Sequence, residues 1–264
     1  MLAQGCAGGR AQCSQNFPDR RVAHAYDRVL MDEIVRVQEA ALNNAEWCHL
    51  FCRSHGILGC FDGVAWSSAE RTPALYPDAV TLVPGCSAQT VISRVDATAG
   101  CSIKDSFADL DLSAYGFEVL FSAEWLCQKH VRCLALSKGW STVVAADELE
   151  RWEAVWGEPP APRPFFRCEL LADERIKILA RSDEERFRAG AVANRSHGVI
   201  GLTNVFDLDG DLESAWSDSA SAARAVWGPM PVVGYDTGES LDAAHRARFE
   251  SIGSLVVWVN QGHA

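Results

Sequence analysis

The stretch AGAVANRSHGVIGLTNVFD, residues 189–207, decides the fold. It contains two β-rich runs, and Ser196-His197-Gly198 between them is a tight-turn sequence, so it predicts a β-hairpin. An acidic loop and a helical segment that ends at Gly228-Pro229 follow the hairpin, and the apolar run PVVG (231–234) comes next. A hairpin that leads through a helix into a further strand predicts a sheet with mixed strand directions.

The order of elements in the C-terminal half has a counterpart in the N-terminal half. Each half has a strand, a loop and a helix, which are at 78–97 in the N-terminal half and at 198–223 in the C-terminal half. Each then has a strand, an acidic loop and a β-rich run with a Trp, at 101–126 and at 232–259 respectively. Such self-similarity indicates one unit used twice. We therefore expect two α/β lobes with a cleft between them, over residues 22–136 and 137–264, after a flexible tail at 1–21.

The segment 22–55 carries apolar residues at helical spacing. It predicts two helices, with a break near Asn43 and Asn44.

The composition disfavours several kinds of partner. The chain has 35 acidic and 24 basic residues, for a net charge of −11. Nucleic acids and anionic membranes are disfavoured, whereas small cationic amines would be attracted. No run approaches the ~20 apolar residues of a membrane span, and the N-terminus lacks a secretory apolar region, so we expect a cytoplasmic protein.

No metal is expected. Cys48 and Cys52, with His49, His55 and Cys60 nearby, have an alternative interpretation as a zinc site, but no C-x-x-C pair is present. The acidic run 207–213 is consistent with a calcium or magnesium loop, or with a capped and solvated helix start.

The order of elements resembles that of the GCN5-related N-acetyltransferase (GNAT) superfamily: helices come first, then a strand meander, and then strand–loop–helix–strand–helix–strand. The likeness covers 141–259 and, more loosely, about 24–127. It implies an α/β (α+β) fold of two GNAT-like lobes. Each lobe would be a mixed, mostly antiparallel twisted sheet flanked by helices, with one pair of neighbouring strands splayed apart.

The resemblance also implies acyl transfer from acetyl-CoA or another acyl-CoA to an amine. Pantetheine would lie along a strand edge, here at Thr203, Val205 and Phe206, and the diphosphate on N–H groups at the next helix start. The sequence departs from the family at the loop before this helix, residues 207–213, because the loop is acidic and lacks the Q/R-x-x-G-x-G/A motif. The uncharged loop with Gly85 and Ser87 is the alternative binding site for the diphosphate.

Candidate catalytic residues follow from the same resemblance. Tyr235, after a strand, would protonate the leaving thiolate, or would only pack as an aromatic residue. Asn204, inside an apolar strand, would hold a substrate amide or satisfy a β-bulge. Glu46 is the candidate general base.

Candidate substrate residues lie on two elements. Asn43, Asn44 and Trp47 lie at the expected helix break, where capping and core packing are the alternatives. Lys104 and Asp105 interrupt a strand near its C-terminal end, where they would contact a ligand or form an edge ion pair.

Three functions remain open. The first is an acyl-CoA-dependent N-acyltransferase, with acetyl as the expected acyl group, acting as a monomer or homodimer on a small amine or amino-acid-like substrate. The second is a GNAT-like protein with a degenerate CoA site that binds a ligand or has been repurposed. The third is an aminoacyl-tRNA-dependent transferase, which the absence of basic runs disfavours.

Overall fold

The computed structural model describes the greater part of the chain, namely residues 20–129, 139–157, 163–183 and 186–262. The chain divides into two units, one that ends at Asp32 and one that begins at Glu33. The described part of the first unit is the start of a helix. All contacts reported below lie within the second unit.

Helices and strands alternate along the chain. The α-helices are α1 (Arg20–Ser54), α2 (Ala88–Ile92), α3 (Ala146–Trp156), α4 (Leu212–Trp227) and α5 (Gly238–Arg246), and the short 3-10 helices are η1 (Ser113–Tyr115) and η2 (Cys168–Ala172). The strands are β1 (Gly59–Phe61), β2 (Ala65–Ser68), β3 (Ala79–Thr81), β4 (Ser102–Asp105), β5 (Phe117–Gln128), β6 (Trp140–Thr142), β7 (Ile176–Asp183), β8 (Arg186–Ser196), β9 (Val199–Asp207), β10 (Val232–Asp236) and β11 (Glu250–Asn260).

The described strands form one mixed sheet in the order β1-β2-β3-β4-β11-β5-β10-β9-β8-β7-β6. The last strand of each half pairs with the other half, since β11 lies beside β4 and β5 lies beside β10. The mixed, mostly antiparallel sheet flanked by helices is confirmed, but the halves share one sheet instead of forming two. This symmetric order is what a duplicated unit with exchanged last strands would give, and the duplication itself stays a prediction.

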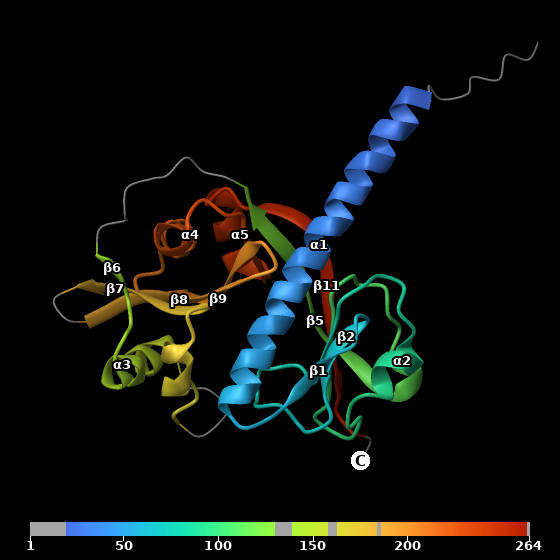
Figure 1. Cartoon of the computed structure of the whole chain (residues 1–264), viewed down its shortest axis with the longest axis horizontal. Coiled ribbons are helices and arrows are strands. Elements are labelled where there is room, and N and C mark those ends of the chain that lie inside the picture. Colours follow the sequence, from blue (N-terminus) through green and yellow to red (C-terminus); the bar gives the residue numbers. More distant parts are fainter. Residues whose placement is uncertain (1–19, 130–138, 158–162, 184–185, 263–264) are drawn as a thin grey trace, which may run out of the picture. The chain divides into compact units, whose positions relative to one another are not determined.

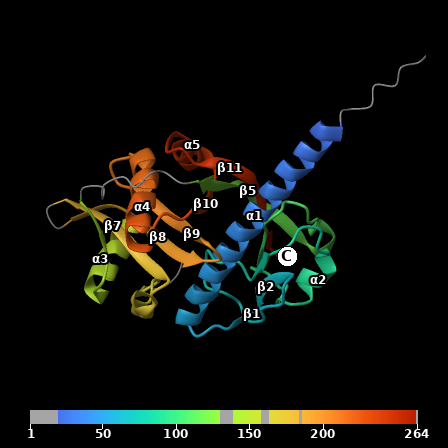
Figure 2. The same ribbon diagram turned by 45° about the horizontal axis from the view of Figure 1, so that its top comes forward.

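Helices cover both faces of the sheet. On one face, α1 and α3 pack over residues such as Ile178; on the other, α4 and α5 pack over its neighbour Leu179. Successive residues of a strand point to opposite faces, so one strand contributes to both cores. Figures 1 and 2 show the part of α1 that belongs to the second unit, residues 33–54, running across the sheet, and α4 and α5 next to each other near β9 and β10.

Strands β9 and β10 run parallel but separate after a short paired segment. Their pairing consists of Ile200 with Val232 and Gly201 with Val233. Beyond these pairs, β10 continues on β5 and β9 continues on β8. The two strands therefore part in the middle of the sheet, which is the splayed pair that the resemblance implied.

The expected break at Asn43 and Asn44 is wrong, because α1 is one helix through both residues. Both side chains have tertiary partners. Asn43 Nδ2 donates to the carbonyl of Asn194 at 3.3 Å and to Ser196 Oγ at 3.0 Å, and Asn44 accepts from Lys104. These bonds replace the capping bonds that favour Asn at helix ends, so the helix continues.

Two further expectations concern residues outside those described. The predicted tail at 1–21 lies there except for its last residues, which begin α1, and so does the boundary at 136 and 137. No helix of the described part is long and apolar enough to cross a bilayer.

Candidate functional site

A pocket of about 260 Å³ lies where β9 and β10 part. A smaller hollow between the same strands adjoins it and shares several of its residues. The pocket brings together six residues that the sequence singled out: Asn44, Trp47, Lys104, Thr203, Asn204 and Tyr235. They come from α1, from β4 of the first half and from β9 and β10 of the second, so both halves contribute to one site.

A buried lysine forms the polar centre of the pocket. Lys104 is 3% exposed. Its Nζ donates to Asn44 Oδ1 at 2.8 Å and to the Tyr235 hydroxyl at 2.9 Å, and lies 4.1 Å from the centre of the Tyr235 ring. Tyr235 is held in turn by an edge-to-face contact with Trp125, with ring centres 5.3 Å apart. Packing and hydrogen bonds thus fix the positions of all three polar groups.

The charge of Lys104 has no counterion among the described residues. None of the ion pairs there includes Lys104, and no acidic residue is among the described residues that line the pocket. The thiol of Cys48, which also lines the pocket, does not compensate, because burial raises the pKa of Cys48 to about 11. A buried ammonium without a counterion is costly, so this pocket favours an anionic group.

Asn204 lies at a β-bulge on the pocket side of the parting. The register of β8 against β9 shifts between Gly190 and Val192, opposite Asn204. Asn204 has φ of 54°, in the left-handed region that Asn accepts more readily than most residues. Its Oδ1 is buried and has no hydrogen-bond partner in the structure. Asn204 therefore lies in the bulge and presents an acceptor without a partner among the described residues, and its role in holding a substrate or cofactor amide stays a prediction.

The walls of the pocket are aromatic, and sequence reasoning missed most of them. Tyr76 and Phe165 line the pocket with Trp47; the centres of the Trp47 and Tyr76 rings are 6.1 Å apart, as are those of Tyr76 and Phe165. Both missed residues lie in proline-containing loops, at 69–78 and 163–167. Bulky aromatic residues inside such loops were the available signal, because a loop that carries them must pack against something apolar.

The acidic β9–α4 loop does not fit a diphosphate. Asp207 Oδ1 accepts from the backbone N–H groups of Asp209 at 2.7 Å and Asp211 at 3.2 Å. Asp211 in turn caps α4 by accepting from the N–H of Ser214 at 3.1 Å. Carboxylates of the chain thus accept from three of the N–H groups in this loop and the first turn of α4, where an anion would bind. Of the two interpretations of this loop, the structure has the capped helix start, and no group of three or more potential metal ligands occurs among the described residues.

In the alternative diphosphate site of the first half, side chains of the protein also accept from backbone N–H groups. The N–H of Gly85 donates to Asp109 Oδ2 at 2.7 Å. Ser87 caps α2 by accepting from the N–H of Thr90 at 3.2 Å. Carboxylates of the chain thus accept from the N–H groups of Gly85, Asp209, Asp211 and Ser214 in the two predicted diphosphate loops. Neither Gly85 nor Ser87 lines the strand-parting pocket.

Glu46 and Asp105 do not lie in the pocket either, contrary to expectation. The Glu46 carboxylate pairs with Arg175 at 2.6 Å. Asp105 is fully buried and accepts from the N–H groups of Phe107 at 3.2 Å and Leu110 at 2.8 Å. Burial raises the pKa of Asp105. It does not pair with Lys104, because adjacent strand residues point to opposite faces.

The remaining predicted residues are close to the site without lining the larger pocket. Asn43 lines the smaller hollow, where its amide bonds to the hairpin, as described above. Val205 packs against the core under α4 and α5. Phe206 packs against Trp152, with ring centres 5.4 Å apart. Val205 and Phe206 thus have core contacts, and Thr203 is the predicted strand residue that faces the pocket.

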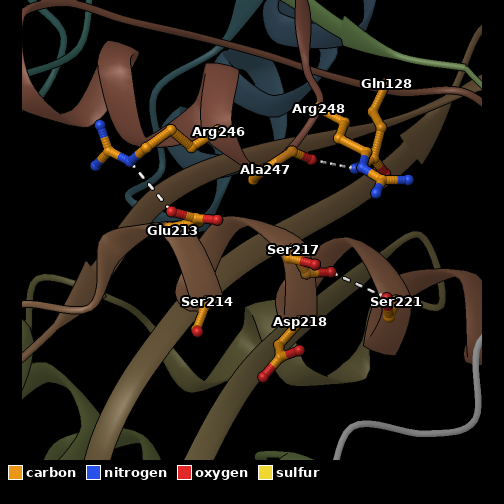
Figure 3. Close-up of a pocket in the computed structure, with 9 residues that line it drawn as sticks. All are labelled: Gln128, Glu213, Ser214, Ser217, Asp218, Ser221, Arg246, Ala247 and Arg248. Atoms are coloured by element: carbon orange, nitrogen blue, oxygen red, sulfur yellow. Dashed lines mark hydrogen bonds and ion pairs between the residues drawn. The ribbon is translucent and has the colours of Figure 1, made fainter.

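A second pocket, of about 400 Å³, lies between α4 and the end of α5 (Figure 3). In this second pocket, Arg246 forms an ion pair with Glu213 at 3.1 Å. Gln128 Nε2 donates a hydrogen bond to the carbonyl of Ala247 at 2.7 Å. The buried polar atoms without partners among the described residues include none from this lining. The strand-parting pocket, which has such an atom and an unpaired cation, is therefore the stronger candidate.

Solved structures share this fold. A GCN5-related N-acetyltransferase from Kribbella flavida matches with a TM-score of 0.55 and 16% identity, over 85% of this chain and 96% of that one. A GNAT-family protein from Novosphingobium aromaticivorans matches with a TM-score of 0.53 and 13% identity, over 85% and 99%. The sequence matches no protein-family model and no curated protein. The chain has the fold of the GCN5-related N-acetyltransferases.

Proposed function

We propose that this protein is an N-acyltransferase for a small amine, and that it recognises its acyl-thioester donor through the pantetheine arm and not through the diphosphate. The observation that carries the proposal is the parting of β9 and β10 after Gly201 and Val233, with a pocket at the parting. An extended arm can pair with a strand edge that has no neighbour, as an added strand does.

Acyl transfer from a thioester to an amine forms a C–N bond, breaks a C–S bond and moves a proton from nitrogen to sulfur. Tyr235 is the candidate proton donor to sulfur, because it lines the pocket and is fixed by Lys104 and Trp125. Cys48 is not a candidate nucleophile, because burial raises its pKa to about 11 and leaves it a thiol near neutral pH. Glu46 lies outside the pocket and pairs with Arg175, so it is not in place to remove the proton from the amine.

The bonded N–H groups in the two predicted diphosphate loops support recognition of the donor through its pantetheine arm. Asp207 and Asp109 hold N–H groups in both places where a diphosphate was expected. A bound diphosphate would have to displace a carboxylate of the chain and would lie close to it. Recognition through the uncharged pantetheine arm has no such cost.

The test is product formation by the full-length protein. Purified protein is incubated with acetyl-CoA, or with the acetyl thioester of N-acetylcysteamine, and a panel of small amines; acylated products are identified by mass spectrometry. Tyr235→Phe keeps the ring against Trp125 but removes the hydroxyl, and we expect it to lower turnover about 10²- to 10⁴-fold. Tyr115→Phe, at an exposed tyrosine on η1, is the matched control and should leave turnover unchanged. No product from any pair of donor and amine would contradict the proposal.

A second candidate function is ligand binding without transfer. It is favoured by the absence of an acidic residue among the described residues that line the pocket and by the bonded N–H groups in the two predicted diphosphate loops. Saturable binding of a small molecule at the pocket, without turnover of any thioester, would establish it.

A further inference from the structure

Two hydrogen-bond donors in the strand-parting pocket are unused. An ammonium group has three N–H donors, and Lys104 uses two of them, on Asn44 and Tyr235. The Tyr235 oxygen accepts from Lys104, while its own O–H has no acceptor among the described residues. The two unused donors belong to groups 2.9 Å apart. An anionic group of a ligand could therefore accept from the unused N–H of Lys104, and its charge would compensate the buried ammonium. The Tyr235 O–H then stays available to the leaving sulfur.

One acceptor in the same pocket is also unused. Asn204 Oδ1 is buried without a partner among the residues that the structure describes, and the bulge fixes the backbone that carries it. A buried acceptor left unpaired is costly, so its natural partner is an N–H group of a ligand. The pocket thus has a place for an anionic oxygen and a place for an N–H donor.

The rest of the pocket is apolar and small. Trp47, Tyr76 and Phe165 supply aromatic walls, and Phe121 from β5 lines the pocket as well. The volume of about 260 Å³ lies below the range of about 300–1,000 Å³ that is usual for drug-sized ligands. Its occupant should be a small molecule with an apolar or aromatic part.

We propose that this pocket binds a small apolar amino acid or a close analogue, with the ligand carboxylate on Lys104 and the ligand nitrogen on Asn204. Binding of this ligand does not depend on the proposed function. Its role as the acyl acceptor does rest on that function, because the ligand would lie at the parting of β9 and β10. It differs from the expectation of a simple cationic amine: the chain is acidic overall, but the pocket carries a positive charge.

The first test compares ligands that differ in one group. Calorimetry with the unmodified protein measures L-phenylalanine, its amide, which lacks the carboxylate, and hydrocinnamate, which lacks the nitrogen; leucine and tryptophan with their amides extend the series. Loss of the carboxylate should weaken binding at least about 10-fold, as expected for a charge-assisted hydrogen bond, and loss of the nitrogen should weaken it about 5-fold. Equal binding of every acid and its amide, or no binding of any ligand, would overturn the inference.

The second test uses variants. Lys104→Met should abolish the preference for the acid over the amide, whereas Lys177→Met, on β7 away from the pocket, should leave it intact. Asn204→Ala should reduce the preference for phenylalanine over hydrocinnamate and leave the preference for the acid intact. If Lys104→Met retains the preference, the inference is wrong; if the variant does not fold, the comparison of ligands in the unmodified protein decides.

The outcomes separate this inference from the proposed function. Binding that depends on the carboxylate, without transfer of an acyl group, would support the inference and reject the transferase. Acyl transfer to amines that lack a carboxylate, with no effect of Lys104→Met on the choice of substrate, would support the transferase and reject the inference.

Discussion

Asp207→Asn tests the claim that the chain's own carboxylates occupy the diphosphate position. The Asp207 carboxylate accepts two backbone N–H groups of its loop and pairs with Arg181 at 2.7 Å. Its side chain is 1% exposed, whereas that of Arg181 is 32% exposed, so solvent screens the pair in part. Asparagine keeps an oxygen acceptor but loses the charge. We expect a loss of about 1–2 kcal/mol in the free energy of unfolding, or about 2–8 °C in melting temperature.

The same change should improve binding of a ligand that carries a diphosphate. A phosphate at the loop would lie ~5 Å from the removed charge, and that repulsion is about 1–3 kcal/mol at dielectric constants of ~80 to ~20. We therefore expect CoA to bind the variant about 5- to 150-fold more tightly than the unmodified protein. Pantetheine, which has no diphosphate, should bind both proteins equally.

Calorimetry with CoA and pantetheine measures both effects. Asp242→Asn, at an exposed carboxylate on α5, is the matched control for the change in net charge and should affect neither ligand. Much tighter binding of CoA than of pantetheine to the unmodified protein, together with weaker CoA binding by Asp207→Asn, would refute the reasoning. That result would mean that the loop rearranges and holds the diphosphate.

Three further predictions concern stability and reactivity. Gly201→Ala would place a methyl group 1.9 Å from Asn43 Oδ1, so urea unfolding should show a loss of about 1–3 kcal/mol that Asn43→Ala partly restores. Cys60 is exposed and should react with iodoacetamide near neutral pH, while burial raises the pKa of Cys48 to about 11 and should protect it; peptide mass spectrometry distinguishes the two. Burial raises the pKa of Asp236 above 3.8, so its contribution to stability is largest below that pH and falls as pH rises through the folded value. The stability of the unmodified protein relative to Asp236→Asn should therefore decline as the pH rises above 3.8, and a flat difference would contradict this assignment.

The sequence predicted the order of elements because each element has a local signal. The hairpin 189–207 has its turn at Ser196-His197-Gly198, and α4 ends at a Gly-Pro pair. The pairing of β5 and β11 across the halves could not be predicted, since each strand satisfies its own apolar pattern equally well beside either partner. The continuous α1 was missed because partners distant in the sequence decide whether an Asn caps a helix or bonds elsewhere.

The candidate site was predicted in part. Residues that interrupt an apolar pattern, such as Lys104 and Asn204, were found because a polar group in a strand needs a partner. Glu46 was placed wrongly because its partner Arg175 is remote in sequence, so the ion pair has no local signal. Tyr76 and Phe165 were missed because the loops that carry them gave no periodic pattern to interpret.

The most direct test of the account is a crystal structure of the full-length protein with a stable thioether analogue of acetyl-pantetheine. The account predicts that the arm lies between β9 and β10, bonded to the free edge of β9, with its sulfur near the Tyr235 hydroxyl. An analogue bound elsewhere, for example between α4 and α5, with β9 and β10 closed against each other, would contradict it.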